Sequence, residues 1–309
     1  MGLLGGCVHR GSSLDGRIVF SSNRSVAPGT HLWAIDPSGD LTSLKQLTFG
    51  DQADHDPRVS PDGTLMAFAR TRPSGAASSS IWVRSLVSGV ETRITNDESA
   101  SDTLPFWSPN GNVLGFVRGA AVPGNGSTTE QRVWVVPIVH RDARIQAGRP
   151  SMPADIPAIS ADWNPVTGSD LLLMRQEPDG WAPFSIIRLP YPPASPTVLI
   201  AYDGRGYYTP TYSPDGLRFA FVRYRREIDL GELYVARADG SEPTPIACQP
   251  GWNQPAWSPN GTEVVVVRST EPGLWRLTVP PAGAACSEGV RVTRGAYQDT
   301  SPDWAVVRR

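Results

Sequence analysis

The sequence predicts an all-β protein, a six-bladed β-propeller with four strands in each blade. The first observation is a turn signature, Ser-Pro-Asp/Asn-Gly, whose prolines recur roughly every 43 to 56 residues, a spacing typical of solenoids and propellers. Proline presets φ, Asp or Asn bonds its own backbone, and glycine supplies the positive φ that closes such a turn. The copies stand at residues 60–63, 108–111, 213–216 and 258–261, with degenerate copies at 164–165 and 301–303.

The second observation is the set of short strands around each turn. Before the turn, Pro-x-aromatic or Pro-x-Val marks a first strand, as at residues 105–107. After it comes a strand that is apolar at consecutive positions, as at 66–68, which is typical of burial on both faces. A third strand has an aromatic residue at its centre, and a fourth ends in a motif such as Arg-Ile-Thr at 93–95. Four strands per repeat predict a propeller blade.

The two ends of the chain predict how the ring closes. The chain begins with three strands that have no first strand of their own, and an unpaired first strand lies at residues 301–306. Pairing of 304–306 with 18–20 would close a sixth blade and leave no open sheet edge. Arg58 and Asp303 hold equivalent positions in neighbouring first strands, so we expect an ion pair across this seam. The five complete repeats begin at about residues 54, 102, 158, 207 and 252, and the three orphan strands lie at about 17–20, 31–35 and 45–49.

The repeat resembles the TolB-type propeller repeat of bacteria, also described as WD40-like or PD40. Residues 102–111 read Asp-Thr-Leu-Pro-Phe-Trp-Ser-Pro-Asn-Gly, close to the family pattern Asp-x-x-Pro-x-Trp-Ser-Pro-Asp-Gly, and the likeness extends over about residues 16–309. The resemblance implies the fold, whereas such propellers serve as partner-binding domains, peptidase gates and sugar-lyase scaffolds. TolB itself has an α/β domain before its propeller, and only about sixteen residues precede the first strand here, so the role of TolB in the outer-membrane Tol system is not transferred.

Composition and charge narrow the function classes. The 309 residues carry a net charge of −2, from 28 Lys and Arg against 30 Asp and Glu, and the basic residues are scattered singly. This distribution lacks the electrostatic footprint of a nucleic-acid-binding protein. No apolar run is long enough to span a membrane. We expect one propeller domain at residues 16–309 and a monomer.

The first 15 residues form a leader or a lipoprotein anchor segment in this interpretation. Residues 4–7, Leu-Gly-Gly-Cys, resemble the lipobox of bacterial lipoproteins, Leu-x-Gly-Cys, in which the cysteine thiol accepts the lipid. The charged and long apolar regions of a signal peptide are absent, so either the gene start lies upstream or the match arises by chance. We expect an extracytoplasmic protein, periplasmic or at the cell surface, with membrane attachment through a lipidated Cys7.

The two remaining cysteines could form a disulfide in an oxidising compartment, but they are predicted to be unpaired. Cys248 ends the outer strand of the fourth blade, and Cys286 precedes the outer strand of the fifth blade. This placement would leave them near opposite faces of the ring, beyond the Cα separation of about 7 Å that a disulfide tolerates.

The candidate binding site lies on the face that carries the long loops between second and third strands, because recognition concentrates on loops of a rigid scaffold. Three residues before the repeat proline, blades one, two and six have aspartate, and blades four and five have an aromatic residue. Carboxylates gathered at a channel mouth would attract a cationic group, and oxygen ligands suit Ca²⁺. Alternatively, each aspartate accepts hydrogen bonds from its own linker. The predicted site residues are Asp54, Asp102, Asp299, Tyr207 and Trp252.

Catalytic residues are not predicted. The four histidines, at positions 9, 31, 55 and 140, lack the paired spacing of a zinc site, and no Gly-x-Ser-x-Gly elbow is present. We therefore expect neither a metal centre nor a cofactor, beyond Ca²⁺ at the channel mouth. The favoured function is a non-catalytic binding or scaffold protein that recognises a protein or peptide partner through the loop-rich face and channel mouth. The alternative is an enzyme that uses the channel, such as an oligogalacturonate-like polysaccharide lyase.

Overall fold

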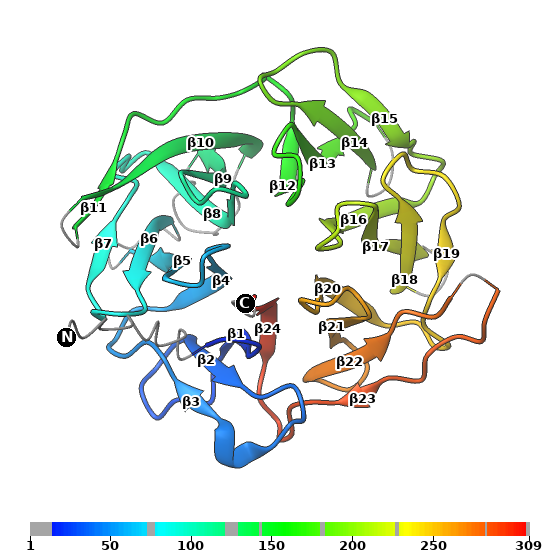
Figure 1. Ribbon diagram of the computed structural model, residues 1–309, viewed down its shortest axis with the longest axis horizontal. Coiled ribbons are helices and arrows are strands. Elements are labelled where there is room, and N and C mark those ends of the chain that lie inside the picture. The colour runs from blue at the N-terminus through cyan, green and yellow to red at the C-terminus, as the bar shows by residue number, and fades with distance from the viewer. Residues whose placement is uncertain are drawn as a thin grey trace, which may run out of the picture.

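Six four-stranded antiparallel sheets surround a central axis, and this arrangement confirms the predicted propeller (Figure 1). The computed structural model describes residues 14–72, 78–120, 129–141, 144–179, 183–225, 229–281 and 283–306. Its only described helical element is the 3-10 turn η1 (Leu41–Ser43). Cys7 and the rest of the proposed leader up to residue 13 lie outside these residues, as do parts of the loops between second and third strands.

Each blade runs from an inner strand at the axis to a short outer strand at the rim (Figure 1). The expected starts of the first strands at residues 54, 158 and 252 coincide with the observed ones, and those at 102 and 207 differ by one or two residues. The strands, from axis to rim, are β4 (Asp54–Val59), β5 (Leu65–Thr71), β6 (Ser79–Ser85) and β7 (Glu91–Arg93) in blade one; β8 (Ala100–Trp107), β9 (Val113–Ala120), β10 (Thr129–Arg141) and β11 (Arg144–Ala147) in blade two; β12 (Ala158–Trp163), β13 (Asp170–Gln176), β14 (Phe184–Pro190) and β15 (Thr197–Ile200) in blade three; β16 (Gly206–Tyr212), β17 (Arg218–Arg225), β18 (Leu230–Arg237) and β19 (Thr244–Pro245) in blade four; β20 (Trp252–Trp257), β21 (Glu263–Arg268), β22 (Leu274–Thr278) and β23 (Val290–Arg291) in blade five; and β24 (Asp299–Trp304), β1 (Ile18–Ser22), β2 (His31–Ile35) and β3 (Lys45–Gln46) in blade six.

The chain ends close blade six as predicted. Strand β24 pairs antiparallel with β1, with Trp304 opposite Ile18 and Asp299 opposite Ser22. The pairing therefore lies slightly earlier in the chain than expected, since the strand ends at Trp304 and only the Ala305 N–H continues the ladder, to the Arg17 carbonyl.

The repeated turn forms for the reasons that its sequence suggests. In blade one, Gly63 has φ of 63°, and its N–H donates to the Ser60 carbonyl at 2.7 Å. The Ser60 hydroxyl donates to Asp62 and accepts from the Leu65 N–H. The same serine-centred bonds recur at Ser108, Ser213 and Ser258.

The core lies between blades, because the second strands are buried on both faces as their sequence predicts. In β5, Leu65 to Ala69 are all buried. One face of this strand packs with Trp107 and Leu114 of blade two, and the other packs with Val19 of blade six. Each blade is thus stabilised by its two neighbours.

The prediction for the cysteines is wrong, because Cys248 and Cys286 form a disulfide with Cα atoms 5.0 Å apart. The chain between β22 and β23 reaches across the rim to blade four. There Ala247 forms a parallel bridge with Ser287, whose carbonyl accepts from the Cys248 N–H. This crossing brings together two cysteines that a regular blade would hold apart.

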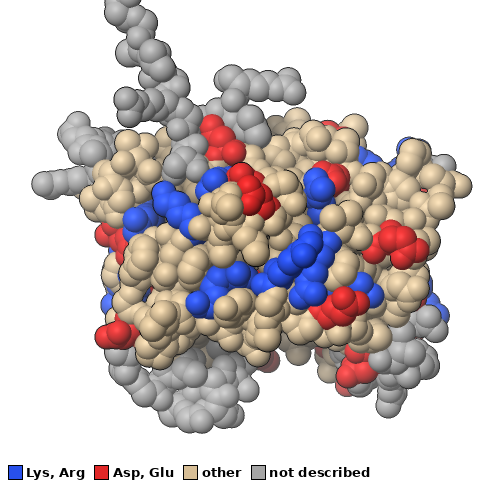
Figure 2. Space-filling model, turned by 90° about the horizontal axis from the view of Figure 1, so that it is seen from below, with Lys and Arg blue, Asp and Glu red and all other residues tan. Residues whose placement is uncertain are grey.

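Seen from the side of blades five and six, the ring is a thick disc (Figure 2). Basic side chains form a band across this side, with acidic side chains beside it (Figure 2). The side is therefore mixed in charge. No helix among the described residues is long and apolar enough to cross a membrane.

Candidate functional site on the ring axis

The three predicted aspartates are buried and bound to arginines. Arg70 binds Asp54 through Nε and Nη2 at 2.6 and 2.9 Å, and Arg118 binds Asp102 in the same way at 2.7 and 2.8 Å. Arg24 donates from Nη2 to both carboxylate oxygens of Asp299. The three aspartate residues are at most 3% exposed, so their carboxylates face arginines and are withdrawn from solvent.

Each of these arginines is also stacked on aromatic rings. The guanidinium carbon of Arg118 lies 5.0 Å from the Trp134 ring centre, and that of Arg70 lies 4.9 Å from the Trp82 ring centre. Burial alone would lower the pKa of Arg118, but the hydrogen bonds and charge of Asp102 outweigh burial and raise it. The arginine therefore remains charged and links the inner strand to the third strand of its blade.

The two predicted aromatic residues take the place of the aspartates in blades four and five. Trp252 is fully buried, with Arg268 stacked over its ring at 4.9 Å. Tyr207 lies in the inner strand opposite Arg223, its partner in the β16–β17 register. None of the five predicted residues lines the two cavities along the axis that are described below.

A binding role for these five residues stays a prediction. For Ca²⁺ the geometry is unfavourable, because guanidinium groups already occupy both oxygens of each of the three carboxylates. In the part of the chain that the structure describes, no three residues of the metal-binding types converge.

A ring of residues with a strained backbone surrounds the axis, two positions after the predicted aspartates and aromatic residues on the inner strands. Every inner strand has a register shift at this level, the mark of a β-bulge. In five blades the bulge holds a left-handed residue just before proline, with φ between 45° and 54°, although none of the five is glycine. Such a conformation costs about 1–3 kcal/mol and occurs preferentially at functional sites. The residues are Asp56, Leu104, Thr209, Gln254 and Ser301, and Ser160 holds the corresponding place in blade three.

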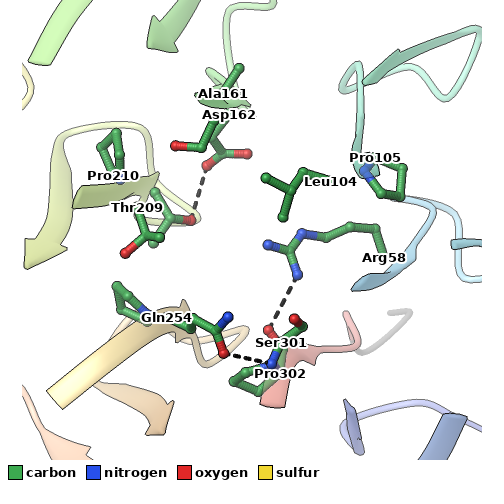
Figure 3. A pocket seen from close by; sticks show the side chains of 13 residues that line it. Arg58, Leu104, Pro105, Ala161, Asp162, Thr209, Pro210, Gln254, Ser301 and Pro302 are labelled. Atoms are coloured by element: carbon green, nitrogen blue, oxygen red, sulfur yellow. Dashed lines mark hydrogen bonds between the residues drawn. The ribbon is translucent and has the colours of Figure 1, made fainter. Parts of the chain in front are cut away.

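Hydrogen bonds join only part of this ring. Gln254 accepts from the Ser301 N–H at 2.8 Å, and the Ser301 hydroxyl donates to Asp56 at 2.6 Å. In blades three and four, by contrast, the buried hydroxyl oxygens of Ser160 and Thr209 have no hydrogen-bond partner. Both residues line a small axial cavity, the mid-channel cavity, together with Arg58, Asp162 and the remaining ring residues except Asp56 (Figure 3).

The next level along the axis is charged. Arg58 extends from β4 into the cavity and donates from Nη1 to the Pro302 carbonyl at 3.2 Å (Figure 3). The expected ion pair between Arg58 and Asp303 is not formed, because Asp303 instead accepts from the Val59 N–H at 2.8 Å. Asp162 likewise accepts from the Tyr212 N–H of the following blade at 2.7 Å.

Burial perturbs both of these aspartates. It raises the pKa of Asp162 to about 6, against the opposing effects of the Tyr212 N–H and the charge of Arg58. Burial also raises the pKa of Asp303, again opposed by Arg58. The centre of the channel therefore holds a permanent cation, Arg58, beside a carboxyl group whose pKa burial raises to about 6.

Beyond Arg58 the channel opens as a funnel on the face of the Ser-Pro-Asp/Asn-Gly turns. This turn-side funnel has a volume of about 320 Å³. Its walls are rigid, because the aromatic side chains are buried and two tryptophans are fixed by hydrogen bonds to the preceding blade in space, Trp107 to the Arg58 carbonyl and Trp257 to that of Thr211. The funnel is lined by Trp107, Trp163, Tyr212, Trp257 and Trp304, by the turn prolines 61, 109, 165, 214 and 259, and by Val59 and Val306, among others.

A separate network fixes the ring on the side of blade one. His55 bonds Asp56 through Nδ1 at 2.9 Å and Ser79 through Nε2 at 3.0 Å. Burial raises the pKa of Asp56, but the charge and hydrogen bond of His55 outweigh burial and lower it to about 2. The order of these groups is that of a hydrolase relay. However, Ser79 is only 6% exposed and lines neither axial cavity, so we assign the network to structure.

Several of these residues were not predicted, although the sequence contains a signal for them. An arginine recurs two residues after the central apolar position of the second strand. In the sheet it lies opposite the residue that stands three places before the repeat proline of the same blade. These arginines are Arg70, Arg118, Arg223 and Arg268. The middle position of Pro-x-aromatic, which carries Arg58 and Asp303, contributes a residue to the lining of the funnel in every blade. The motif itself could have located this level.

Together these features define a six-bladed propeller with a polar axial site beneath an apolar funnel. No protein-family model matches the chain, and no curated protein matches it. Among solved structures, TolB from Acinetobacter baumannii is similar over 94% of this chain and 66% of its own, with 18% identity and a TM-score of 0.66.

Other propellers are similar at the same level. Oligogalacturonate lyase from Vibrio parahaemolyticus matches 89% of this chain and 74% of its own, with 14% identity and a TM-score of 0.57. A chain of a nidogen/laminin complex matches 85% of this chain and 89% of its own, with 12% identity and a TM-score of 0.61. The chain thus has the fold of the TolB-type propellers, a fold that binding proteins and enzymes share.

Proposed function

We propose that the protein is a non-catalytic, extracytoplasmic binding protein that holds a protein or peptide partner at the turn-side funnel. The observation that carries the proposal is the funnel itself, a cavity of about 320 Å³ lined largely by aromatic, proline and valine side chains, with Arg58, Asp162 and Asp303 also in its lining. Apolar concavities with few, well-placed polar groups are typical of binding sites. Its rigid walls favour affinity because little conformational entropy is lost on binding.

The nidogen/laminin complex and the disulfide give further support. A propeller of the same architecture is part of that protein complex, so the fold is compatible with partner binding. Stable disulfides are typical of oxidising compartments, which favours an extracytoplasmic location for a chain that links Cys248 to Cys286. Lipid attachment at Cys7 remains part of the proposal, and intact-mass analysis of membrane-extracted protein tests it.

The test uses two exposed valines as a matched pair. Val306 lines the funnel and is 42% exposed, whereas Val290 lies on the rim strand β23 and is 57% exposed. A photo-crosslinking residue at 306 should capture a discrete partner from a native envelope fraction, and one at 290 should not. Val306→Lys should abolish capture, and Val290→Lys should leave it intact.

The same experiment separates the funnel from the loop-rich face. Replacement of Asp54, Asp102 and Asp299 by asparagine tests the predicted loop-side residues. Because these side chains are buried against arginines, cooperative unfolding of the variant in urea is confirmed before capture is compared. If capture is lost in this variant and retained in Val306→Lys, the partner binds the loop-rich face and the funnel proposal is wrong.

The enzymatic alternative has weaker support. Similarity to oligogalacturonate lyase at 14% identity shows the fold alone, and one such lyase structure is a complex with manganese. Histidine is a common metal ligand in proteins. Of the described histidines, His31 is buried without a hydrogen-bond partner and His55 is engaged by Asp56 and Ser79. Elemental analysis of purified protein, combined with an assay for oligogalacturonate cleavage, tests the alternative directly.

A further inference from the structure

We propose that Arg58, Ser160 and Thr209 form a receptor for a carboxylate group in the mid-channel cavity. The inference rests on the proposed function, in that the carboxylate belongs to a partner segment that enters from the turn-side funnel. Around this cavity some polar groups are already hydrogen-bonded, whereas others remain free.

The free donors belong to Arg58. Its Nη1 donates to the carbonyls of Pro57 and Pro302, both at 3.2 Å. Among the described residues, its Nε and Nη2 make no hydrogen bond, and Arg58 forms no ion pair within 4.0 Å. A guanidinium edge with two free N–H groups matches the two oxygens of a carboxylate.

The acceptors near Arg58, in contrast, are already engaged. Asp162 accepts from the Thr211 hydroxyl and the Tyr212 N–H, and Asp303 accepts from the Val59 N–H. Asp56 accepts from His55 and Ser301. Each of these carboxylates thus has donors of its own, so the free N–H groups of Arg58 remain available to a ligand that supplies acceptors.

Two buried hydroxyl groups complete the receptor. The oxygens of Ser160 and Thr209 are shielded from solvent and have no partner, although buried polar groups are normally hydrogen-bonded. Both residues line the cavity that Arg58 enters, and Thr209 lies across it from Arg58 (Figure 3). Each hydroxyl can donate to an oxygen of the same carboxylate.

Asp162 makes binding depend on pH. The charged and titratable groups that face it are Arg58 of β4 and Tyr212 of β16, and Arg58 also interacts with Asp303 of β24. An ionised Asp162 repels a second carboxylate, whereas a protonated one does not. Because the pKa of Asp162 is raised to about 6, binding should strengthen as pH falls through 6.

Titration calorimetry on the whole protein tests the receptor with defined probes. The probes are acetate, N-acetyl-triglycine with a free carboxylate, and the amide of the same peptide, at pH 5 and pH 7.5. We expect the two carboxylates to bind and the amide not to bind. Tighter binding of the peptide than of acetate assigns the ligand to a partner chain, and equal binding assigns it to a free carboxylate. Both carboxylates should bind several-fold more tightly at pH 5.

Substitutions identify the residues responsible. Arg58→Gln should weaken carboxylate binding at least about tenfold, as expected for loss of a charged hydrogen bond, and Thr209→Val should weaken it by about threefold to tenfold. Arg218→Gln is the matched control, because Arg218 also donates to a backbone carbonyl, that of Gly261, and lines neither axial cavity.

The outcomes are separable from those of the crosslinking experiment. Absence of carboxylate binding, or equal binding by the wild type and Thr209→Val, overturns the receptor even if Arg58→Gln does not fold. Partner capture at Val306 that persists in Arg58→Gln leaves the funnel proposal intact and removes the carboxylate. Binding of acetate without any capture at Val306 supports the carboxylate receptor and contradicts the funnel proposal.

Discussion

Blades one, two and six stabilise their inner strands differently from blades four and five, although all five place an arginine beside the same position. In the first group a buried aspartate binds the guanidinium through both oxygens, as Arg118 and Asp102 do. In the second group an aromatic residue replaces the carboxylate, and Arg268 stacks on Trp252 and Trp275, both at 4.9 Å. The arginine is thus the constant part of the repeat, and the residue it contacts is variable.

The family-pattern aspartate therefore acts inside the blade, where it binds a buried arginine. Where the aspartate is absent, an aromatic ring takes its place. The arginine then lacks the carboxylate but keeps the aromatic ring of the third strand, as Arg268 keeps Trp275. The aromatic pair of blades also carries the Cys248–Cys286 disulfide between them, whereas blade three, with Ala158 at this position, has neither arrangement.

Removal of the arginine should have the largest effect, and the effect should differ between the two groups. Arg118→Met leaves Asp102, only 1% exposed, as an uncompensated buried charge, at a cost of about 3–5 kcal/mol. Arg268→Met leaves no buried charge behind, because its acidic partner Glu271 is half exposed, and should cost about 1–2 kcal/mol, in the range of a partly buried cation–π contact. The two arginine side chains are 14% and 16% exposed, so they form a matched pair for urea unfolding. Equal losses would show that the carboxylate is unimportant.

Loss of the disulfide should have the second-largest effect on the free energy of unfolding. It closes a loop with a sequence separation of 38 residues, and loss of such a constraint costs about 2–4 kcal/mol. Cys248→Ser should lower the free energy of unfolding by this amount, and reduction of the wild type with a thiol should give the same stability. A stability unaffected by reduction would show that blades four and five are held by packing alone.

The fold could be predicted from the sequence because its signal repeats. Each copy of the turn fixes a hairpin through Pro, Asp or Asn, and Gly, and the unpaired strand at residues 301–306 predicted the closure by β24 and β1. The disulfide was missed because it depends on an irregular crossing between β22 and β23, which reaches Ala247 of the neighbouring blade. No repeat encodes that crossing.

The axial site was harder to predict. Its left-handed ring residues carry no glycine, the usual sign of positive φ, and Thr209 and Gln254 have little in common as side chains. Periodicity placed Asp54 and Asp102 correctly on the inner strands, but it could not show that Arg70 and Arg118 bind them. Burial of a charge depends on a partner from another strand, which a pattern along one strand does not reveal.

The pH dependence of stability should differ between Asp162 in blade three and Asp56 in blade one. The pKa of Asp162 is raised from 3.8 to about 6, so its stabilising contribution is complete below about pH 3.8 and is lost as pH rises through 6. The pKa of Asp56 is lowered from 3.8 to about 2, so it contributes about 2 kcal/mol above pH 3.8 that is lost as pH falls through 2.

Urea unfolding between pH 3 and pH 8 measures both effects. Relative to the wild type, Asp162→Asn should gain stability as pH rises from 4 to 7, whereas Asp56→Asn should be less stable throughout this range. Parallel stability curves for the wild type and Asp162→Asn would contradict the raised pKa.

The smallest effect is expected when the buried ion pair is replaced as a whole. Asp102→Leu combined with Arg118→Met removes both charges and leaves apolar side chains against Phe116 and Trp134, the rings on which the guanidinium now stacks. Apolar replacement of a complete buried pair is often neutral or stabilising, so the double variant should lie within about 1 kcal/mol of the wild type in urea unfolding. The single Arg118→Met variant would then be rescued by the second substitution, which removes the buried carboxylate that the first substitution leaves without a partner. If the double variant is as unstable as Arg118→Met, the aspartate contributes more than charge compensation, and the two groups of blades are not interchangeable solutions.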